Sequence, residues 1–562
     1  MPTINIPGVS IRLAVASAPE LTLTPISYDQ INVSWDAKAT NGLVLERSTN
    51  GTSGWVVVGY DGADDTERKL FFHEPSTTYY FRARYYDPTE GYSGYSSVVN
   101  ASTNSQSGTD YYVATTGSDI AAGTSGAPFA TLSKATSVAV AGDRILIKAG
   151  THTDDTISNS FGSNEYIVDS YYASFNIQSS GTEAQPITIK PAAGAEGLVL
   201  LDCETTKSGI LIDDYDYIHI GGLEIFDMNI SGIRNHGHFG NNPLSSGANS
   251  TGCVIEDNYV HDLIGPSGFN CSLISPWGSI DWIVRNNKMH DAKWSTGAKM
   301  ACMQSYGLVN IIVENNLMYN CSMGVMWKDH HVVNATTREK VQESEFRYNL
   351  VHTTSERGFW LTNRASNSTE AGNNQVHHNI FYDCTASERS TIGESMAAGY
   401  AVSGLMEVYH NIIDNGDAAG WTIECQAGNT QLLGNITTRI GGNSFIAIDY
   451  ALQLGLDTSD YNIFDTGSAY SLDYYGGGST TTSTLSTWQG YEAASFVTLL
   501  NDYPDVNSVN EVEGNIYTNI STRDYTHKTG GTALNFMADG SHAGAYQTKG
   551  EIIGLLPGYT GG

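Results

Sequence analysis

The chain has 562 residues, of which 28 are Lys or Arg and 59 are Asp or Glu, so its formal net charge is −31. This acidic balance argues against nucleic acid as a partner, because nucleic acids select basic surfaces. Hydrophobic residues make up 40% of the chain and glycines number 59, which favours a folded, turn-rich protein of several domains or one long repeat array. No apolar run is long enough for a membrane span.

The first 18 residues form an expected N-terminal tail. They are polar and interrupted by Pro2 and Pro7, and no positively charged stretch followed by an apolar one marks a signal peptide. The seven cysteines are scattered without the spacing of a metal site. We therefore expect buried thiols, with no structural disulfide and no zinc.

Residues 19–104 read as a small antiparallel β-sandwich. Alternating strand-like runs are separated by Gly, Asn and Pro turns. Trp35 lies in an early strand, and Pro75, Thr77 and Tyr79 form a Pro-x-Thr-x-Tyr phrase. This segment resembles a fibronectin type III domain, which implies a spacer or an adhesion module. Residues 105–110 are a polar linker.

Residues 111–152 have the features of a cap. A short amphipathic helix is predicted from about Thr131 to Val140, followed by Gly142-Asp143 and a strand from Arg144 to Lys148. A helix here would cover the open end of a first coil, whose strand groups are otherwise unpaired. The phrase resembles the N-terminal cap of pectate-lyase-like β-helix proteins.

A repeated phrase follows from Val254 to about Ile463: a strand-like run, an Asn, an apolar residue, then often His or Tyr. The repeated asparagines are Asn258, Asn287, Asn316, Asn349, Asn379, Asn411, Asn435 and Asn462, at intervals of 24 to 33 residues. Three positions before each of the first seven an apolar residue occurs, and two positions before the first five a charged residue or His. Such alternation predicts side chains that point in turn to core and solvent.

Units this short cannot bury their apolar faces alone and must stack on their neighbours. We therefore predict an all-β protein: a right-handed, single-stranded parallel β-helix over residues 111–547, preceded by the antiparallel sandwich. Each repeated Asn is expected to adopt the left-handed conformation at a turn and to hydrogen-bond to the next coil. The column three residues after each Asn (His261, His290, Tyr319, His352 and Tyr382) is interpreted as an exterior ladder, with metal binding or acid–base chemistry as the alternative.

In pectate-lyase-like helices the cleft lies on the first strand of each coil. By that resemblance the first strands are expected near residues 232–238, 271–277, 299–305, 323–331, 358–364 and 420–425. Aligning Gly324, Gly358 and Gly420 places Lys328, Thr362 and Glu424 in one column, with Gln304 beneath Lys328. Residues 281–364 also carry ten Lys or Arg against eight Asp or Glu, a local basic island that would attract an anionic ligand.

The run MGVMWKDHH loosely resembles the strand that carries the catalytic Arg of alginate lyases and chondroitinase-B-like lyases, with Lys328 where Arg would stand. β-Elimination of a uronate needs its carboxylate neutralised, a base for the C5 proton and a proton for the departing oxygen. The candidate catalytic residues are Lys328, His330, His331, Arg357 and Arg364. The candidate substrate-binding residues are Arg234, His236, His238, Gln304, Lys299, Trp327 and Trp360.

A calcium ion is a possible cofactor, because it also neutralises carboxylates. Glu256 with Asp257, and Asp213, Asp214 and Asp216, offer oxygen ligands of the kind calcium prefers. No EF-hand or glycine-rich calcium repeat accompanies them, so the identity of any metal stays open.

At the other end, residues 524–547 resemble the closing phrase of bacterial β-helix enzymes, and residues 548–562 form a C-terminal tail. The expected function is a depolymerase of an anionic polysaccharide, a lyase first. The alternatives are a glycoside hydrolase on the same fold and a non-catalytic glycan-binding adhesin or phage tail-spike component. Either way an extracellular protein is expected, secreted or part of a virus particle, as a monomer or a homotrimer.

Overall fold

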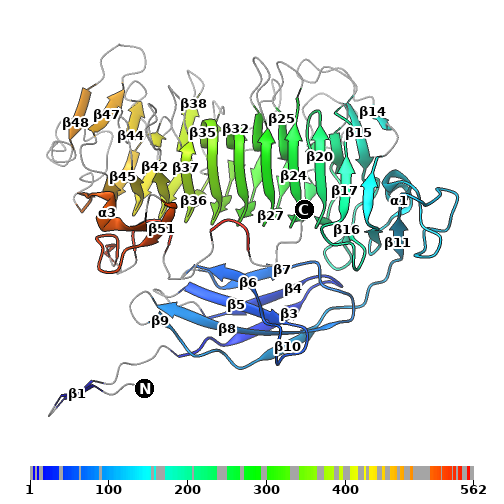
Figure 1. Ribbon diagram of the computed structural model, residues 1–562, viewed down its shortest axis with the longest axis horizontal. Helices are drawn as coiled ribbons and strands as arrows, with labels where there is room; N and C mark the ends of the chain where they lie inside the picture. The colour runs from blue at the N-terminus through cyan, green and yellow to red at the C-terminus, as the bar shows by residue number, and fades with distance from the viewer. Residues whose placement is uncertain are drawn as a thin grey trace. The chain divides into compact units, whose positions relative to one another are not determined.

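The computed structural model describes most of the chain (Figure 1). The described residues are 4–6, 9–11, 17–36, 42–62, 65–87, 91–153, 157–159, 171–205, 208–236, 250–265, 271–292, 300–328, 341–363, 372–384, 392–396, 406–414, 423–425, 430–438, 446–449, 456–464, 469–473, 481–484, 507–519, 522–534, 536–538, 542–546 and 553–556. The chain forms two compact units, and the main boundary between them in the sequence falls between Ser105 and Gln106. Among the described residues no helix is long and apolar enough to cross a membrane.

The first unit contains an antiparallel β-sandwich, as expected. One sheet has the order β3 (Leu21–Pro25), β4 (Ile31–Trp35), β7 (Glu67–Leu70). The other has the order β10 (Val99–Ser102), β8 (Thr78–Asp87), β5 (Gly42–Ser48), β6 (Val56–Asp61), with β9 (Gly91–Tyr92) beside β8. A short hairpin of β1 (Ile4–Ile6) and β2 (Val9–Ile11) precedes them.

Trp35 and Tyr79 hold this sandwich together. Trp35 packs in the core with Ile31, Val33 and Phe81. The Tyr79 hydroxyl accepts a hydrogen bond of 2.9 Å from the backbone N–H of Glu74, the contact of a tyrosine corner. The Pro-x-Thr-x-Tyr phrase therefore has a structural explanation.

The second unit is a parallel β-helix whose coils form three sheets, parallel throughout except for the pairs β14–β15 and β47–β48 (Figure 1). One sheet has twelve strands: β11 (Asp110–Val113), β12 (Arg144–Ile147), β16 (Ile187–Pro191), β19 (Ile218–Gly221), β23 (Val254–Glu256), β27 (Ile283–Arg285), β31 (Ile312–Glu314), β34 (Glu345–Arg347), β36 (Asn374–His377), β39 (Met406–Tyr409), β42 (Thr430–Leu433) and β45 (Leu456–Asp460). A short sheet consists of β22 (Ser250–Thr251), β26 (Ser279–Ile280), β30 (Leu308–Val309) and β33 (Val341–Gln342).

The third sheet is the largest, because the strands that begin and end each coil merge into it. Its strands are β13 (Gly150–His152), β14 (Ile157–Asn159), β15 (Tyr171–Asn176), β17 (Val199–Asp202), β18 (Ser208–Leu211), β20 (Glu224–Met228), β21 (Ile233–His236), β24 (Tyr259–Leu263), β25 (Cys271–Trp277), β28 (Lys288–Ala292), β29 (Met300–Tyr306), β32 (Leu317–Lys328), β35 (Leu350–Asn363), β37 (Ile380–Cys384), β38 (Ile392–Met396), β40 (Ile412–Asp414), β41 (Ile423–Cys425), β43 (Ile436–Thr438), β44 (Ile446–Asp449), β46 (Ile463–Phe464), β47 (Ala469–Asp473), β48 (Thr481–Thr484) and β49 (Val509–Asn510).

The predicted cap is present. Helix α1 (Leu132–Val138) begins at Thr131, whose hydroxyl accepts a hydrogen bond from the backbone N–H of Lys134, the usual N-cap contact. Its buried face adds Leu132 and Ala135 to the core of the β-helix. Strand β12 follows where the sequence predicts it, so this end of the core is covered by apolar side chains.

The asparagine ladder is confirmed. Asn316 is fully buried, and its amide Nδ2 donates to the carbonyls of Val284 and Glu314 at 3.0 Å and to Asn349 Oδ1 at 2.9 Å. Equivalent bonds link the asparagines from Asn258 to Asn462. The left-handed conformation was expected at each ladder Asn, but it occurs at the residue before each of them. It is Asn315 (φ 55) before Asn316, for example, and this leaves the ladder amide free to point inward.

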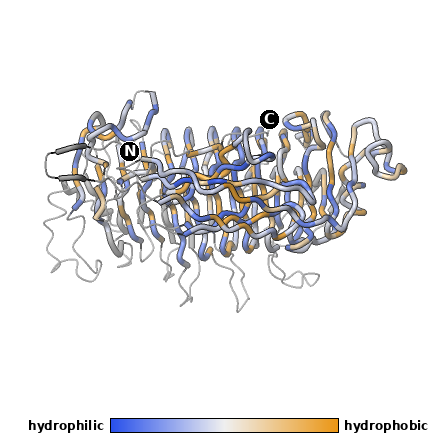
Figure 2. Tube along the Cα trace, turned by 90° about the horizontal axis from the view of Figure 1, so that it is seen from below, coloured by the Kyte–Doolittle hydropathy of each residue, from blue (hydrophilic) through white to orange (hydrophobic). Residues whose placement is uncertain are grey.

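Apolar positions alternate with polar ones along the coils, as the tube coloured by hydropathy shows (Figure 2). The inward positions form one continuous core from Val113 to Phe464. Removing this much apolar surface from water is the main stabilising term of such a fold.

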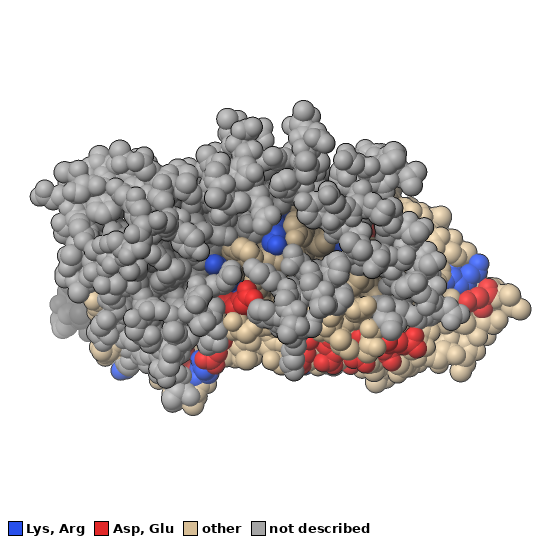
Figure 3. All heavy atoms as spheres, turned by 90° about the horizontal axis from the view of Figure 1, so that it is seen from above, with Lys and Arg blue, Asp and Glu red and all other residues tan. Residues whose placement is uncertain are grey.

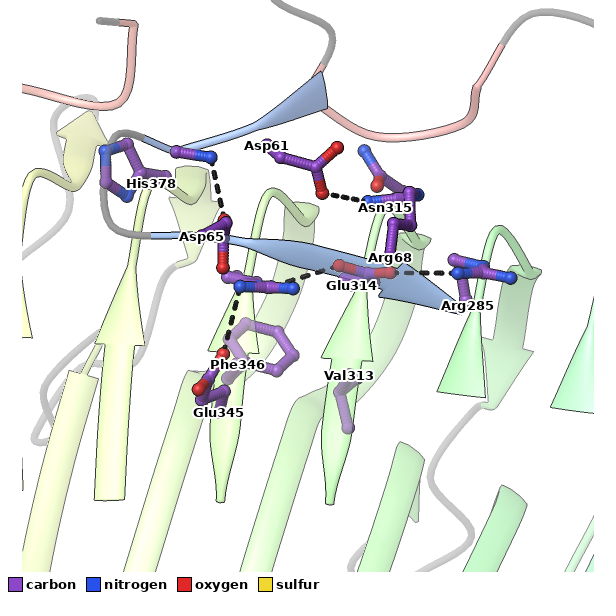
Figure 4. Close-up of polar contacts among 12 residues, drawn as sticks. Asp61, Asp65, Arg68, Arg285, Val313, Glu314, Asn315, Glu345, Phe346 and His378 are labelled. Carbon is purple, nitrogen blue, oxygen red and sulfur yellow. Dashed lines mark hydrogen bonds and ion pairs between the residues drawn. The ribbon is translucent and has the colours of Figure 1, made fainter. Parts of the chain in front are cut away.

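The residues two positions before the first four ladder asparagines are charged. Their side chains pair with one another in a row of ion pairs. Glu256, Arg285, Glu314 and Arg347 lie on neighbouring strands in register. Arg285 bonds to Glu256 at 2.8 Å and to Glu314 at 3.3 Å, and the second oxygen of Glu314 accepts from Arg347 at 3.0 Å. Figure 4 shows Glu314 beside Arg285 in this row. Alternating signs place opposite charges on adjacent strands.

The column three after each Asn is a stack of rings. Centroids are 5.2 Å apart for His261 and His290, 4.5 Å for His290 and Tyr319, 4.9 Å for Tyr319 and His352, and 4.5 Å for His352 and Tyr382. Rings stacked face to face leave only their edges for other partners. The structural interpretation of this column therefore holds.

The described residues of the C-terminal segment, from Glu513 onward, add no further coil. Helix α3 (Glu513–Ile516), β50 (Tyr517–Asn519) and β51 (Asp524–His527) pack on an outward row of isoleucines from successive coils. The row consists of Ile380, Ile412, Ile436 and Ile463. Arg523 fixes this segment through 2.6 Å and 3.2 Å contacts to Asp383 and Asp414. Residues 524–546 therefore lie along the flank of the helix, although a closing phrase was expected at its end.

Candidate active site

The first strands of five successive coils present their outward side chains in rows. The strands are β21, β25, β29, β32 and β35, each paired in parallel with the next. The register places Lys328 beside Tyr306 on one side and beside Thr362 on the other. The pairing of Lys328 with Thr362 agrees with the predicted column.

Lys328 is held by aromatic rings. Its Nζ lies 3.3 Å from the hydroxyl oxygen of Tyr306 and 5.2 Å from the centre of that ring. The centre of the Trp360 ring lies 5.5 Å from the same nitrogen, so the ammonium group faces two aromatic partners at cation–π distance. Lys328 and Tyr306 are both partly exposed.

Two arginines flank the pair along the helix axis. The guanidinium carbon of Arg357 lies 5.4 Å from the ring centre of Trp360. On the other side, that of Arg234 lies 4.2 Å above Trp277, whose ring meets Tyr306 edge to face at 4.8 Å. Cations and aromatic rings therefore form one continuous series, which we call the cation–aromatic row. Its members are Arg234, Trp277, Tyr306, Lys328, Trp360 and Arg357.

Seen from above, Lys and Arg atoms show through between the undescribed atoms, and Asp and Glu atoms gather along one edge (Figure 3). The outward positions of the same strands also include an apolar cluster of Ala301, Met323, Met326 and Trp360. The row thus brings positive charge and aromatic rings together: Lys328 and Tyr306 are partly exposed, whereas Arg234, Trp277, Trp360, Arg357 and the apolar cluster are buried. This combination suits a sugar ring that carries a carboxylate.

Gln304 does not lie beneath Lys328. Its register partner is Met326, and Tyr306 occupies the predicted place. Gln304 is fully buried, and its Nε2 donates to the Tyr306 hydroxyl oxygen at 3.2 Å. In this structure Gln304 therefore supports Tyr306 from the interior and is not exposed to a ligand.

Trp327 was expected to bind substrate, but the structure places its side chain in the core. Its side chain points into the helix, is fully buried, and packs edge to face on Phe359 with ring centres 5.1 Å apart. Neighbouring residues of a strand point to opposite faces, so the outward position of Lys328 requires an inward Trp327. Trp360, in contrast, points outward as predicted.

Glu424 does not share the column of Lys328. Strand β38, which the spacing did not reveal, lies between β35 and β41, and Glu424 pairs with Gly393, in the column of Trp360. Because β38 was not counted, the sequence analysis placed Glu424 on the strand next to Thr362 and in the wrong column. Several predicted site residues lie outside the described residues: Lys299, His330, His331, Arg364 and His238, together with the side chain of His236.

Tyr306 was missed by the sequence analysis, which ended its strand at residue 305. The signal was present, because the phrase CMQSY carries Tyr306 two residues after Gln304, on the same face of the strand. A strand longer by one residue would have identified it. Trp277 likewise ends its strand on the outward face.

The acidic pairs considered for calcium have other partners in the structure. Glu256 is ion-paired with Arg285, Asp257 Oδ1 accepts from Asn286, and Asp216 Oδ1 accepts the backbone N–H of Thr251. In the part of the chain that the structure describes, no three His, Cys, Asp or Glu side chains converge in a metal-binding arrangement.

Comparisons with known proteins agree with this architecture. Residues 111–263 match the family model described as "Pel9A-like, right handed beta helix region", and residues 341–466 match one described as "Disaggregatase related". The first match agrees with the right-handed parallel β-helix predicted for this part of the chain. No curated protein sequence matches the chain.

Three solved structures illustrate the likeness. A rhamnogalacturonan lyase is 16% identical over 63% of this chain and 87% of its own, with a TM-score of 0.39. A family 28 exopolygalacturonase of Yersinia enterocolitica is 12% identical over 77% and 98%, with a TM-score of 0.40. A human fibronectin type III domain is 14% identical over 16% and 72%, with a TM-score of 0.14.

Proposed function

We propose that the chain is an extracellular polysaccharide lyase that cleaves an anionic, uronic-acid-containing glycan by β-elimination at the cation–aromatic row. The observation that carries the proposal is the Lys328–Tyr306 contact on the outward face, with Arg357 and Trp360 on the next strand. The match of residues 111–263 to a right-handed β-helix family model supports the fold, although of the row only Arg234 lies within the matched residues.

The chemistry requires three tasks. A uronate becomes acidic at C5 only when its carboxylate is neutralised, and Lys328 and Arg357 offer positive charge at one place for this purpose. A group must take the C5 proton, and a proton must reach the departing C4 oxygen. Tyr306 and Lys328 both have protons to exchange, and Trp360 offers a ring face for the sugar.

A glycoside hydrolase is the second candidate. It needs two carboxyl groups facing the scissile bond. The register-paired outward positions of β21, β25, β29, β32 and β35 hold no Asp or Glu, and the one acidic residue within these described strands, Glu356, is buried at the register shift between β32 and β35. This composition favours the lyase over the hydrolase.

The test is incubation with a panel of acidic polysaccharides, following ultraviolet absorbance and reducing ends together. Rising absorbance reports the unsaturated uronate of a lyase. Reducing ends without absorbance indicate the hydrolase, and binding without either product indicates the glycan-binding adhesin or tail-spike component. The panel is repeated with EDTA: activity lost and then restored by Ca²⁺ assigns part of the neutralisation to the metal, and unchanged activity leaves it with the cationic side chains.

A further inference from the structure

We propose that Tyr306 is both the base and the acid of the elimination, working from one face of the sugar, so that the preferred uronate carries its C4 oxygen and C5 hydrogen on the same face. Glucuronate and mannuronate have this arrangement. Galacturonate and guluronate have the two groups on opposite faces. The inference rests on the proposed lyase function and adds the stereochemical class of its substrate.

The first argument is the position of the Tyr306 oxygen. It accepts hydrogen bonds from two nitrogen donors, Lys328 Nζ at 3.3 Å and Gln304 Nε2 at 3.2 Å. Two donors aimed at one oxygen stabilise negative charge there, as preorganised donors do at other reacting oxygens. Because Gln304 is fully buried and Trp277 meets the ring edge to face at 4.8 Å, the phenol is fixed before substrate arrives.

The second argument is direction. Tyr306 and Lys328 are paired residues of β29 and β32, and their side chains leave the same outward face of one sheet. Gln304, two residues before Tyr306, shares that face. A sugar ring lying on the row therefore contacts the polar groups of this cluster with only one of its faces. Among the residues that the structure describes here, the cluster supplies no second acid for the opposite face of the ring, which an anti elimination requires.

Tyr306 alone can carry out both proton transfers of the elimination. Its phenolate takes the C5 proton, the C5–H electron pair forms the C4=C5 double bond, and the C4–O4 bond breaks. The departing O4 takes that same proton from the Tyr306 hydroxyl, which returns the phenolate. Lys328 stays an ammonium group throughout and offsets the charge of the phenolate and of the substrate carboxylate. No metal, oxidant or other reactant enters the step.

The experiment compares the full chain on polymers matched in composition but opposite in stereochemistry: polymannuronate against polyguluronate, and polyglucuronate against polygalacturonate. Absorbance of the unsaturated product gives kcat/KM for each. We expect the polymers with C4 oxygen and C5 hydrogen on one face to be cleaved on the order of 100-fold faster or more, the range expected when positioned acid–base catalysis is lost.

Two variants complete the test. Tyr306→Phe keeps the ring and removes the oxygen, and we expect it to lower kcat by about 10²- to 10⁴-fold while glycan binding is retained. Tyr259→Phe, whose hydroxyl contacts His290 in the ring stack at 2.8 Å, is the matched control and keeps wild-type kcat. Both variants are checked for unchanged unfolding.

The outcomes separate the two proposals. Faster cleavage of galacturonate or guluronate, or full activity of Tyr306→Phe, overturns the one-face role of Tyr306 and leaves the lyase function standing. If no polymer yields an unsaturated product, the lyase function itself fails, and the role of Tyr306 fails with it.

Discussion

The Nζ of Lys328 lies 3.3 Å from the hydroxyl oxygen of Tyr306 on the neighbouring strand. This contact joins a cation that the sequence singled out, Lys328, to a phenol that it overlooked. It also links two adjacent coils of the β-helix. The reactive centre therefore depends on the register between coils rather than on any single motif.

Replacing Lys328 tests this centre directly. Lys328→Met keeps the length and apolar packing of the side chain between Tyr306 and Trp360 but removes its charge. We expect kcat to fall by about 10²- to 10³-fold, the loss typical of a donor that stabilises developing charge. The measurement is initial rate of unsaturated product on the preferred polymer.

The matched control is Lys288→Met. Lys288 lies 4.1 Å from the ring centre of Tyr259, so it also makes a cation–π contact, but on the closing strand of its coil. Its replacement should leave kcat and KM unchanged. Equal losses in the two variants would show that Lys328 acts through general charge or stability and has no place in the reaction.

The position of Arg234 predicts that its contribution to KM depends on the length of the oligosaccharide. Arg234 lies three parallel strands from Lys328, which is about 14 Å at the usual strand spacing. Arg234→Met should raise KM for long oligosaccharides by about tenfold, corresponding to ~1.4 kcal/mol, and leave short ones unaffected. Arg234→Lys should not restore the loss, because the stacked planar guanidinium over Trp277 is specific to Arg.

The measurement is kcat and KM across a size series of oligosaccharides. Equal changes at every length, or a change in kcat alone, would place Arg234 in the structural support of Trp277 and remove it from substrate binding.

Much of the fold was predictable because it repeats. The Asn ladder and the ring stack come from spacings that recur once per coil, and the capping helix α1 comes from a short amphipathic pattern. The site was less accessible. An outward column depends on recognising the first strand of every coil. Strand β38, between the phrases of Asn379 and Asn411, was not recognised, and this one omission displaced Glu424. Trp327 and Lys328 are adjacent in sequence but face opposite sides, a difference of one residue in strand phase.

Asn316 tests the ladder as a stabilising device. Asn316→Ala removes an acceptor for two N–H groups of Asn287 and donors for the carbonyls of Val284 and Glu314. These groups are buried, so we expect a loss of about 2–4 kcal/mol in the free energy of unfolding. Urea unfolding followed by circular dichroism measures it.

Asn510→Ala is the control, because Asn510 is exposed at the end of β49. It should change the free energy of unfolding by no more than about 0.5 kcal/mol. A comparable loss at both positions would mean that the ladder bonds contribute nothing specific.

His352 predicts how stability depends on pH. Burial lowers its pKa to about 4, aided by Arg523 and opposed by Asp383, from an ordinary value near 6.5. Above pH 6.5 the imidazole is neutral in both states and its environment carries no penalty. As the pH falls from 6.5 toward 4, the unfolded chain binds a proton that the folded chain does not, so the free energy of unfolding decreases.

The variant that isolates this effect is His352→Tyr. The ring stack already alternates His and Tyr, with Tyr319 and Tyr382 on either side of His352 at 4.9 and 4.5 Å, so a Tyr ring fits the column. Urea unfolding at pH 7.5 and 4.5 should show a smaller loss for the variant than for the wild type, by on the order of 1 kcal/mol. Since all other groups titrate in both proteins, the difference belongs to position 352, and identical losses would show that His352 is protonated in the folded protein as readily as in the unfolded chain.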